Sequence, residues 1–271
     1  MRQENGTQWA DISEWLAWWL AEPRLPPDVQ KAFDRYYKTY RQRFSPYLRR
    51  HYASQTAEVQ ALMRPGTRVL EVGCGCGSES LWFAMNGASV VGIDVNPRRL
   101  PVARERARLV REELGVEIDA RFIHQSLFDF EDAAGFDVIW MEQAFHHIEP
   151  RSDVPSTLSR LLRPNGHVVI SEANGWNPVL QLALLRQRGF QTVRESIDSE
   201  GRKSLYGVER VTTAGRISKQ FSSQGFEETS RRYFRVLPSA PLFERLAWVE
   251  DIVPARFAPI YSHYNIVLRK H

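Results

Sequence analysis

The residues best suited to chemistry in this sequence surround one predicted turn. Gly73, Gly75 and Gly77 occupy alternate positions directly after the apolar run Val69–Val72. Glycine adopts positive φ without strain and lets a ligand approach the backbone closely, so this segment is typical of a strand-to-helix turn around a bound molecule. A second apolar run ends at Asp94, where an acid commonly accepts hydrogen bonds from ribose hydroxyls. The pattern predicts a site for a ribose-containing cofactor.

Two details distinguish this turn from the dinucleotide-binding fingerprint. That fingerprint requires a glycine three positions after Gly75, where this chain has Ser78, and its strand rarely ends in an acid such as Glu71. An acid followed by three alternate glycines and a later acid resembles two motifs of the class I S-adenosylmethionine-dependent methyltransferases, in the small-molecule, type 11 branch. The resemblance implies S-adenosylmethionine as cofactor and S-adenosylhomocysteine as product. Carboxylates and carbonyls suit the ammonium and sulfonium groups of such a cofactor.

The resemblance continues along the chain, over about residues 65 to 175. Phe136–Ile148 is similar to the fourth-strand motif of this family, and Leu161–Gly166 resembles its turn into the fifth strand. The family's adenine loop corresponds to Ser126, with Asp129 as an alternative because the family often has an acid there. The cofactor contacts implied by the resemblance are Glu71, Gly73, Cys74, Gly75, Gly77, Asp94, Val95, Ser126, Leu127, Met141 and Glu142.

Two adjacent histidines, His146 and His147, follow the predicted fourth strand. Imidazole titrates near neutral pH, so both are candidates for a catalytic base. A base is required only if the acceptor is a poor nucleophile such as a hydroxyl, because the sulfonium donor is already activated. The alternative is that one histidine caps or packs beneath the site.

The candidate contacts to the acceptor come from two segments that are rich in aromatic or polar side chains. We expect no metal ion, because Glu142, Glu172 and Asn174 do not reproduce the acidic pair of catechol-type methyltransferases, and because two cysteines, Cys74 and Cys76, are too few for a metal site. The candidates for acceptor binding are Tyr37, Tyr40, Asn174, Trp176, Tyr206 and Arg210.

Alternating apolar runs and amphipathic segments must position these residues. They predict an α/β fold with a doubly wound, mostly parallel sheet, which places ligands at the carboxyl ends of the strands. The resemblance implies seven strands, the last one antiparallel. Residues 1–64 are predicted to form a helical lid, and residues 65–271 a cofactor-binding core with a lid-like insertion at about 174–215. The expected elements include helices over 29–48, from 96, and over 240–253, and strands over 89–94, 233–237 and 260–268.

Composition excludes several classes of protein. The chain has 271 residues, of which 43% are hydrophobic and 25% charged, as in an ordinary globular protein. No apolar run is long enough to span a bilayer, and no signal-peptide segment precedes the first helix, so a cytoplasmic protein without a membrane partner is expected. The formal charge is +4 and the pI about 9.2, but the arginines are scattered, which argues against nucleic acid as a partner.

These observations favour a methyltransferase that acts on a hydroxyl or amine of a small-molecule biosynthetic intermediate. Sequence motifs for methylating nucleobases or protein arginines are absent. Two alternatives stay open: a cyclase or lyase that uses the same cofactor, and a noncatalytic or RNA-associated protein that binds it. A homodimer is possible.

Overall fold

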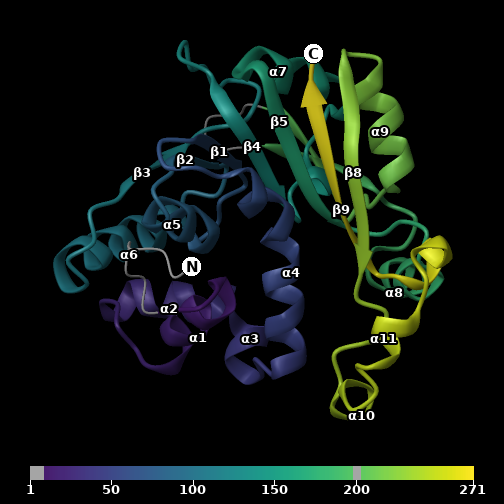
Figure 1. The fold of residues 1–271 in the computed structure, drawn as a ribbon, viewed down its shortest axis with the longest axis horizontal. Helices are drawn as coiled ribbons and strands as arrows, with labels where there is room; N and C mark the ends of the chain where they lie inside the picture. Colours follow the sequence, from purple (N-terminus) through teal and green to yellow (C-terminus); the bar gives the residue numbers. More distant parts are fainter. Residues whose placement is uncertain (1–8, 198–202) are drawn as a thin grey trace. The chain divides into compact units, whose positions relative to one another are not determined.

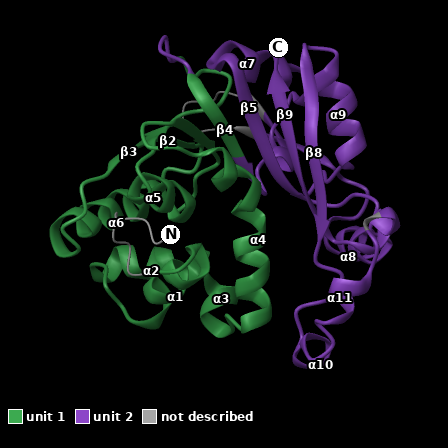
Figure 2. Ribbon diagram, viewed as in Figure 1, with its two compact units in different colours: residues 1–131, 136–140 green, residues 132–135, 141–271 purple. Residues whose placement is uncertain are grey.

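The computed structural model describes residues 9–197 and 203–271, which Figure 1 shows as a ribbon. These residues form two compact units, drawn in different colours in Figure 2. Unit 1 comprises residues 1–131 and 136–140, and unit 2 comprises residues 132–135 and 141–271. The boundary falls within one strand, between Trp140 and Met141.

Seven strands form one sheet in the order β3-β2-β1-β4-β5-β9-β8. Strands β3, β2, β1 and β4 are parallel neighbours, whereas β9 runs antiparallel to both β5 and β8. The predicted doubly wound α/β fold with its seven strands is thereby confirmed. The strands are β1 (Arg68–Val72), β2 (Ser89–Asp94), β3 (Asp119–His124), β4 (Phe136–Glu142), β5 (Leu162–Ala173), β8 (Phe226–Phe234) and β9 (His263–Lys270).

The strands of unit 1 are aligned so that their carboxyl ends meet at one edge. Val72 is paired with Ile93, and Asp94 is paired with His124. Parallel strands covered on both faces consist of nearly continuous apolar runs, and β1 and β2 are buried along almost their whole length. The helices of unit 1 are α1 (Ile12–Ala21), α2 (Pro27–Tyr36), α3 (Lys38–Gln42), α4 (Pro46–Leu62), α5 (Ser78–Met85) and α6 (Leu100–Glu113).

The N-terminal helices depart from the prediction of one long helix over 29–48. The chain leaves the helix at Tyr37 and again at Arg43–Ser45. Ser45 caps α4 by accepting a hydrogen bond from the Leu48 amide, and Pro46 occupies its first turn, so a new helix starts there. These helices belong to the same unit as the first strands; their role as a lid stays a prediction.

The helix expected from Asn96 begins four residues later, at Leu100. The Asn96 side chain accepts a hydrogen bond from the Arg98 amide, and its own amide donates to Asp94. Such a turn, closed by an asparagine side chain, competes with the helix. The consequence is a short loop directly after Asp94.

Unit 2 contains the antiparallel part of the sheet. Part of the insertion predicted at about 174–215 forms a hairpin of β6 (Val193–Ile197) and β7 (Lys203–Gly207); residues 198–202 lie outside the described residues. Of the strand expected over 233–237, only Tyr233 and Phe234 are in a strand, as the last residues of β8. The other elements are η1 (Phe145–His147), η2 (Arg151–Asp153), α7 (Val154–Leu161), α8 (Pro178–Arg188), α9 (Ala214–Ser222), α10 (Pro241–Glu244), α11 (Val249–Ile252) and η3 (Ala255–Ile260).

The amphipathic helix expected over 240–253 was wrong. Two four-residue helices, α10 and α11, replace it. Helices in proteins are stabilised mainly by burying an apolar face, and Leu242, Leu246 and Ile252 are 70%, 43% and 67% exposed. The apolar pattern is present, but no core covers it.

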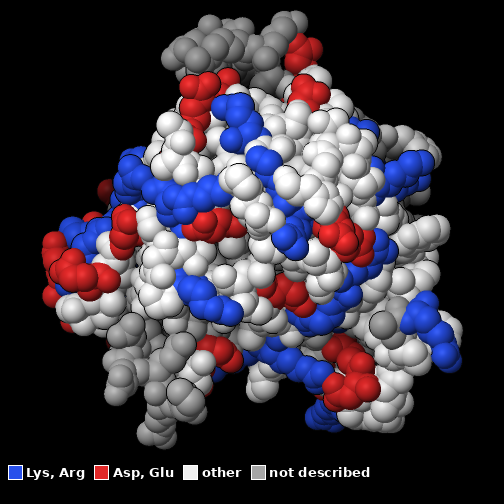
Figure 3. Space-filling model, turned by 45° about the horizontal axis from the view of Figure 1, so that its top comes forward, with Lys and Arg blue, Asp and Glu red and all other residues white. Residues whose placement is uncertain are grey.

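Charged residues on the face drawn in Figure 3 show no concentration of one sign. Lysine and arginine are interspersed with aspartate and glutamate over the face drawn in Figure 3. Within residues 9–197 and 203–271, no helix is both long and apolar enough to cross a membrane.

Candidate active site

The glycine turn joins β1 to α5 in a left-handed conformation. Gly73, Gly75 and Gly77 have φ of 80°, 52° and 74°, which only glycine adopts without strain. The amides of Gly73 and Cys74 both donate to the carbonyl of Ile93, over 2.8 and 3.0 Å. These bonds fix the turn to the end of β2.

Two buried carboxylates accompany the turn. Asp94 is 4% exposed; its Oδ2 accepts a hydrogen bond of 2.9 Å from the Gly75 amide, and Oδ1 accepts one of 2.7 Å from the Asn96 amide. Glu71 is 2% exposed and accepts a hydrogen bond from Ser80 Oγ. Burying a carboxylate is costly unless hydrogen bonds compensate, so these bonds account for two acids at adjacent strand ends.

Tyr36 of α2 covers the glycine turn, which the sequence did not reveal. A Cβ atom on Gly75 would lie 2.3 Å from Tyr36 Oη. The guanidinium of Arg99 lies 5.2 Å from the Tyr36 ring centroid and 3.5 Å from Asp94 Oδ2. Tyr36 belongs to the segment predicted to form a helical lid, but it was not among the residues predicted for the site.

The two predicted acceptor contacts of the N-terminal segment are packed against other side chains. Tyr37 is buried, and its hydroxyl shares a 2.6 Å hydrogen bond with Ser78 Oγ. Burial raises the pKa of Tyr37 well above its ordinary value, so it stays protonated. Tyr40 is half-buried, with its ring 4.9 Å from that of Phe44. Tyr37 therefore supports the start of α5.

The residues predicted for the adenine lie at the ends of β2 and β3. Val95 is 62% exposed and follows Asp94 directly, whereas Leu127 is 4% exposed. Ser126 is half-buried, and its Oγ accepts a 3.3 Å hydrogen bond from the Phe128 amide. Val95 thus offers an apolar surface beside the ribose-binding candidate.

Unit 2 contains the histidine pair. His146 is held by Glu172 of β5. The Glu172 carboxylate accepts a 3.2 Å hydrogen bond from the His146 amide and a 2.7 Å hydrogen bond from His146 Nδ1. Burial lowers the pKa of His146, but the carboxylates of Glu172 and Glu209 outweigh this, and the net pKa is raised. Glu209 Oε2 lies 3.6 Å from His146 Nε2.

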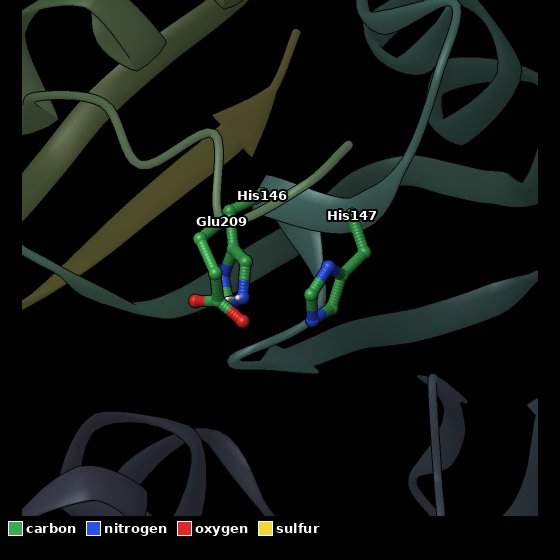
Figure 4. Close-up of side chains that lie close together, drawn as sticks. All are labelled: His146, His147 and Glu209. Atoms are coloured by element: carbon green, nitrogen blue, oxygen red, sulfur yellow. Dashed lines mark ion pairs between the residues drawn. The ribbon is translucent and has the colours of Figure 1, made fainter. Parts of the chain in front are cut away.

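His147 is oriented by the insertion. Its Nδ1 donates a 2.8 Å hydrogen bond to the Gly207 carbonyl, and its ring stacks on Tyr206, with centroids 4.7 Å apart. Burial and then the neighbouring His146 lower the pKa of His147. Figure 4 shows both imidazoles and Glu209 close together, with a dashed line for the ion pair to His146.

The remaining predicted residues have different surroundings. Asn174 is fully buried. Its Nδ2 donates hydrogen bonds to the carbonyls of Ala258 and Tyr261, so both amide hydrogens are bonded to the backbone. Trp176 is 61% exposed. Arg210 pairs with Glu149 over 2.5 Å. At the end of β4, Met141 is fully buried and Glu142 is half-buried.

Comparison with known proteins identifies the domain. A family model described as a methyltransferase domain matches residues 70–170, from β1 to β5. Methyltransferase GfsG from Streptomyces halstedii is 37% identical over 109 residues, which are 40% of this chain and 38% of that protein. The ubiquinone biosynthesis O-methyltransferase of Dechloromonas aromatica (strain RCB) is 35% identical over 115 residues, 42% of this chain and 48% of that protein.

Residues 70–170 match the methyltransferase domain, and the relatives that share this region are methyltransferases. The predicted family and its cofactor class are confirmed. The chain spans less than half the length of these two relatives. The crystal structure of magnesium protoporphyrin IX methyltransferase (ChlM) from Synechocystis PCC 6803, with bound SAH, shares the fold: the TM-score is 0.58 at 18% identity, covering 96% of this chain and 100% of that one.

The methyltransferase domain includes the glycine turn, Asp94 and the histidine pair, but not every residue of the clusters around them. Tyr36, Glu172 and Glu209 lie outside residues 70–170. Sequence reasoning considered Glu172 only as a metal ligand and did not consider Glu209. The roles predicted for the individual site residues stay predictions.

Proposed function

We propose that this protein transfers a methyl group from S-adenosylmethionine to a hydroxyl or amine of a small-molecule intermediate. The observation that carries the proposal is the glycine turn of unit 1, with Glu71 and Asp94 buried at neighbouring strand ends. These features match what the cofactor requires: close approach to backbone and carboxylates beside hydroxyl and ammonium groups.

The residues of unit 1 fit the cofactor in named roles. Asp94 would accept hydrogen bonds from the ribose, and Val95 and Leu127 would contact the adenine, with Ser126 at its edge. Glu71, Gly73 and Cys74 would lie by the methionine part, and Gly75 and Gly77 would keep the backbone open. Met141 and Glu142, which end β4, are proposed as further contacts. When bound, the cofactor supplies an activated methyl group.

The N-terminal helices are proposed to cover the cofactor as the predicted lid. Support comes from Tyr36, whose hydroxyl lies over Gly75, and from Arg99, which lies over the Tyr36 ring. Enclosing the donor excludes water, which competes with the acceptor. The chain's contribution is therefore alignment and exclusion of water.

A small molecule is favoured as acceptor by two observations. One of the relatives is an O-methyltransferase of ubiquinone biosynthesis. In addition, the interspersed charges of Figure 3 do not form the basic stripe typical of nucleic-acid binding. We propose Trp176, Tyr206 and Arg210 as acceptor contacts, since they belong to the insertion predicted at about 174–215.

The deciding experiment combines calorimetry and mass spectrometry on the full chain. We expect S-adenosylhomocysteine to bind with a stoichiometry of one. Incubating S-adenosylmethionine with a panel of phenols, alcohols and amines should yield S-adenosylhomocysteine and a methylated product. Methylthioadenosine as the product would instead indicate a lyase. If neither S-adenosylmethionine nor S-adenosylhomocysteine bound to the chain, the proposal would be overturned.

A further inference from the structure

We propose that His146, His147 and Glu209 bind a divalent transition-metal ion such as Zn²⁺. One ring nitrogen from each histidine and one carboxylate oxygen of Glu209 lie within 4.8 Å of one another. The three side chains come together in unit 2 (Figure 4). This site goes beyond methyl transfer and does not depend on it.

The hydrogen bonds of the histidines prepare their other nitrogens as ligands. His147 Nδ1 bonds to the carbonyl of Gly207, which can only accept, so Nδ1 is the protonated nitrogen. His146 Nδ1 likewise bonds to the Glu172 carboxylate over 2.7 Å. Metal-binding histidines almost always donate their second N–H to a carboxylate or a backbone carbonyl. Both supporting partners are therefore in place. The Nε2 atom of His147 carries a lone pair, and the Nε2 atom of His146 would carry one once a metal ion displaces its proton.

The third ligand is brought in by the insertion. Ile148, which directly follows η1, forms an isolated β-bridge with Tyr206 of β7. A Cβ atom on Gly207 would lie 2.2 Å from the carbonyl oxygen of His146, so only glycine allows this approach. Two residues later, Glu209 has φ of +46°. Strained backbone of this kind persists where the surroundings enforce it, often at functional sites.

The ligand set indicates the class of metal. Two imidazoles and one carboxylate suit Zn²⁺, Fe²⁺ or Co²⁺, whereas Mg²⁺ and Ca²⁺ prefer oxygen ligands. Three protein ligands leave at least one coordination position for water or for a substrate oxygen, as in catalytic zinc sites. The metal ion would lower the pKa of a water molecule or hydroxyl group bound at that position.

A proton in place of the metal ion would also explain why these three side chains lie together. A proton on His146 Nε2 would pair with Glu209, and the imidazolium would then lie between two carboxylates. In that case the cluster is an ion pair without a metal. Titration with metal separates the two possibilities, because an ion pair predicts no stoichiometric binding.

The test uses the full chain after treatment with a chelator, and ZnCl₂ as the titrant. We expect one Zn²⁺ per chain by calorimetry, and visible absorption bands of nitrogen-coordinated metal when CoCl₂ replaces it. Glu209→Gln and His147→Gln should each weaken Zn²⁺ binding at least about tenfold, since even loss of an outer-shell partner costs about 10–100-fold. Glu195→Gln, an exposed glutamate on the same hairpin, is the matched control and should bind as the parent does.

Binding of S-adenosylhomocysteine, measured on the same variants, reports whether the chain is folded. Loss of Zn²⁺ binding with intact S-adenosylhomocysteine binding supports the site. Absence of a stoichiometric Zn²⁺ event in the parent, or unchanged affinity in both ligand variants, would overturn it.

Discussion

The backbone amide of Gly75 donates a 2.9 Å hydrogen bond to the Asp94 carboxylate, joining the glycine turn to the end of the neighbouring strand. Because the other carboxylate oxygen accepts from the Asn96 amide, the acid is held from both sides. The orientation of Asp94 is fixed before a ligand arrives, which lowers the cost of binding.

Replacing Asp94 with alanine should weaken binding of S-adenosylhomocysteine. A lost hydrogen bond to a charged group costs about 1–3 kcal/mol, which calorimetry would measure directly. Asp119→Ala is the control: it removes the same charge from the start of β3, where it bonds to Ser89 at the opposite end of the paired strands. Equal affinities for the Asp94 and Asp119 variants would contradict the ribose role.

Gly75→Ala should reduce S-adenosylhomocysteine affinity at least about tenfold, because the added Cβ would displace Tyr36 from the turn. Gly115→Ala has a similar φ, +62° compared with +52°, but nothing lies within 4 Å of its Cβ position. It therefore shares the backbone strain without the clash. Combining Gly75→Ala with Tyr36→Ala should cost less than the two single effects added together. A purely additive result would show that Tyr36 does not cover the turn.

The two cysteines should resist alkylation in the folded chain. Burial raises the pKa of Cys76 to about 12 and also raises that of Cys74. The thiolate is the reactive form, so at pH 8, well below this pKa, reaction with iodoacetamide should be roughly a thousandfold slower than after unfolding in guanidinium. Mass spectrometry after timed quenching measures both rates. Fast labelling of the folded chain would mean that the turn opens readily.

Glu79→Gln should stabilise the protein at neutral pH. Burial raises the pKa of Glu79 above its ordinary value of 4.5, more than the Tyr52 hydrogen bond of 2.5 Å lowers it. The folded state then binds a proton more tightly than the unfolded state, so the parent loses stability as pH rises from 4.5 through the folded pKa. Glutamine keeps an acceptor for Tyr52 without the charge. Thermal unfolding at several pH values should show an advantage for the variant that grows with pH and then levels off; a constant difference would contradict this.

Local patterns predicted the parts of the fold that depend on neighbouring residues. The strand Ser89–Asp94 was predicted with its observed bounds. In the structure, the side chains of Asn177 and Thr213 accept hydrogen bonds from the amides of Leu180 and Arg216 and so cap α8 and α9. A helix start is a local event, since a side chain two or three positions away satisfies the first amides. The same reasoning failed for the helix expected over 240–253, because helicity there required a tertiary surface.

The histidine cluster shows why part of the site could not be predicted. His146 and His147 follow a recognisable strand motif, but Glu209 reaches them only because Tyr206 of β7 forms a bridge with Ile148, the residue after η1. No periodicity connects residues so far apart in sequence. The only local signal was Gly207, and its need for close approach becomes evident only beside the His146 carbonyl.

Arg106 has a consequence for how the N-terminal segment can behave. Its guanidinium is fully buried, 4.5 Å from the Trp19 ring centroid, and donates to Ser78 and the Cys76 carbonyl. Removing the first helices would take away these aromatic neighbours and expose the guanidinium, with its hydrogen bonds to the glycine turn, to water. The aromatic segment therefore supports the glycine turn through Arg106. We expect the first helices to stay packed on Arg106 when a ligand enters the site.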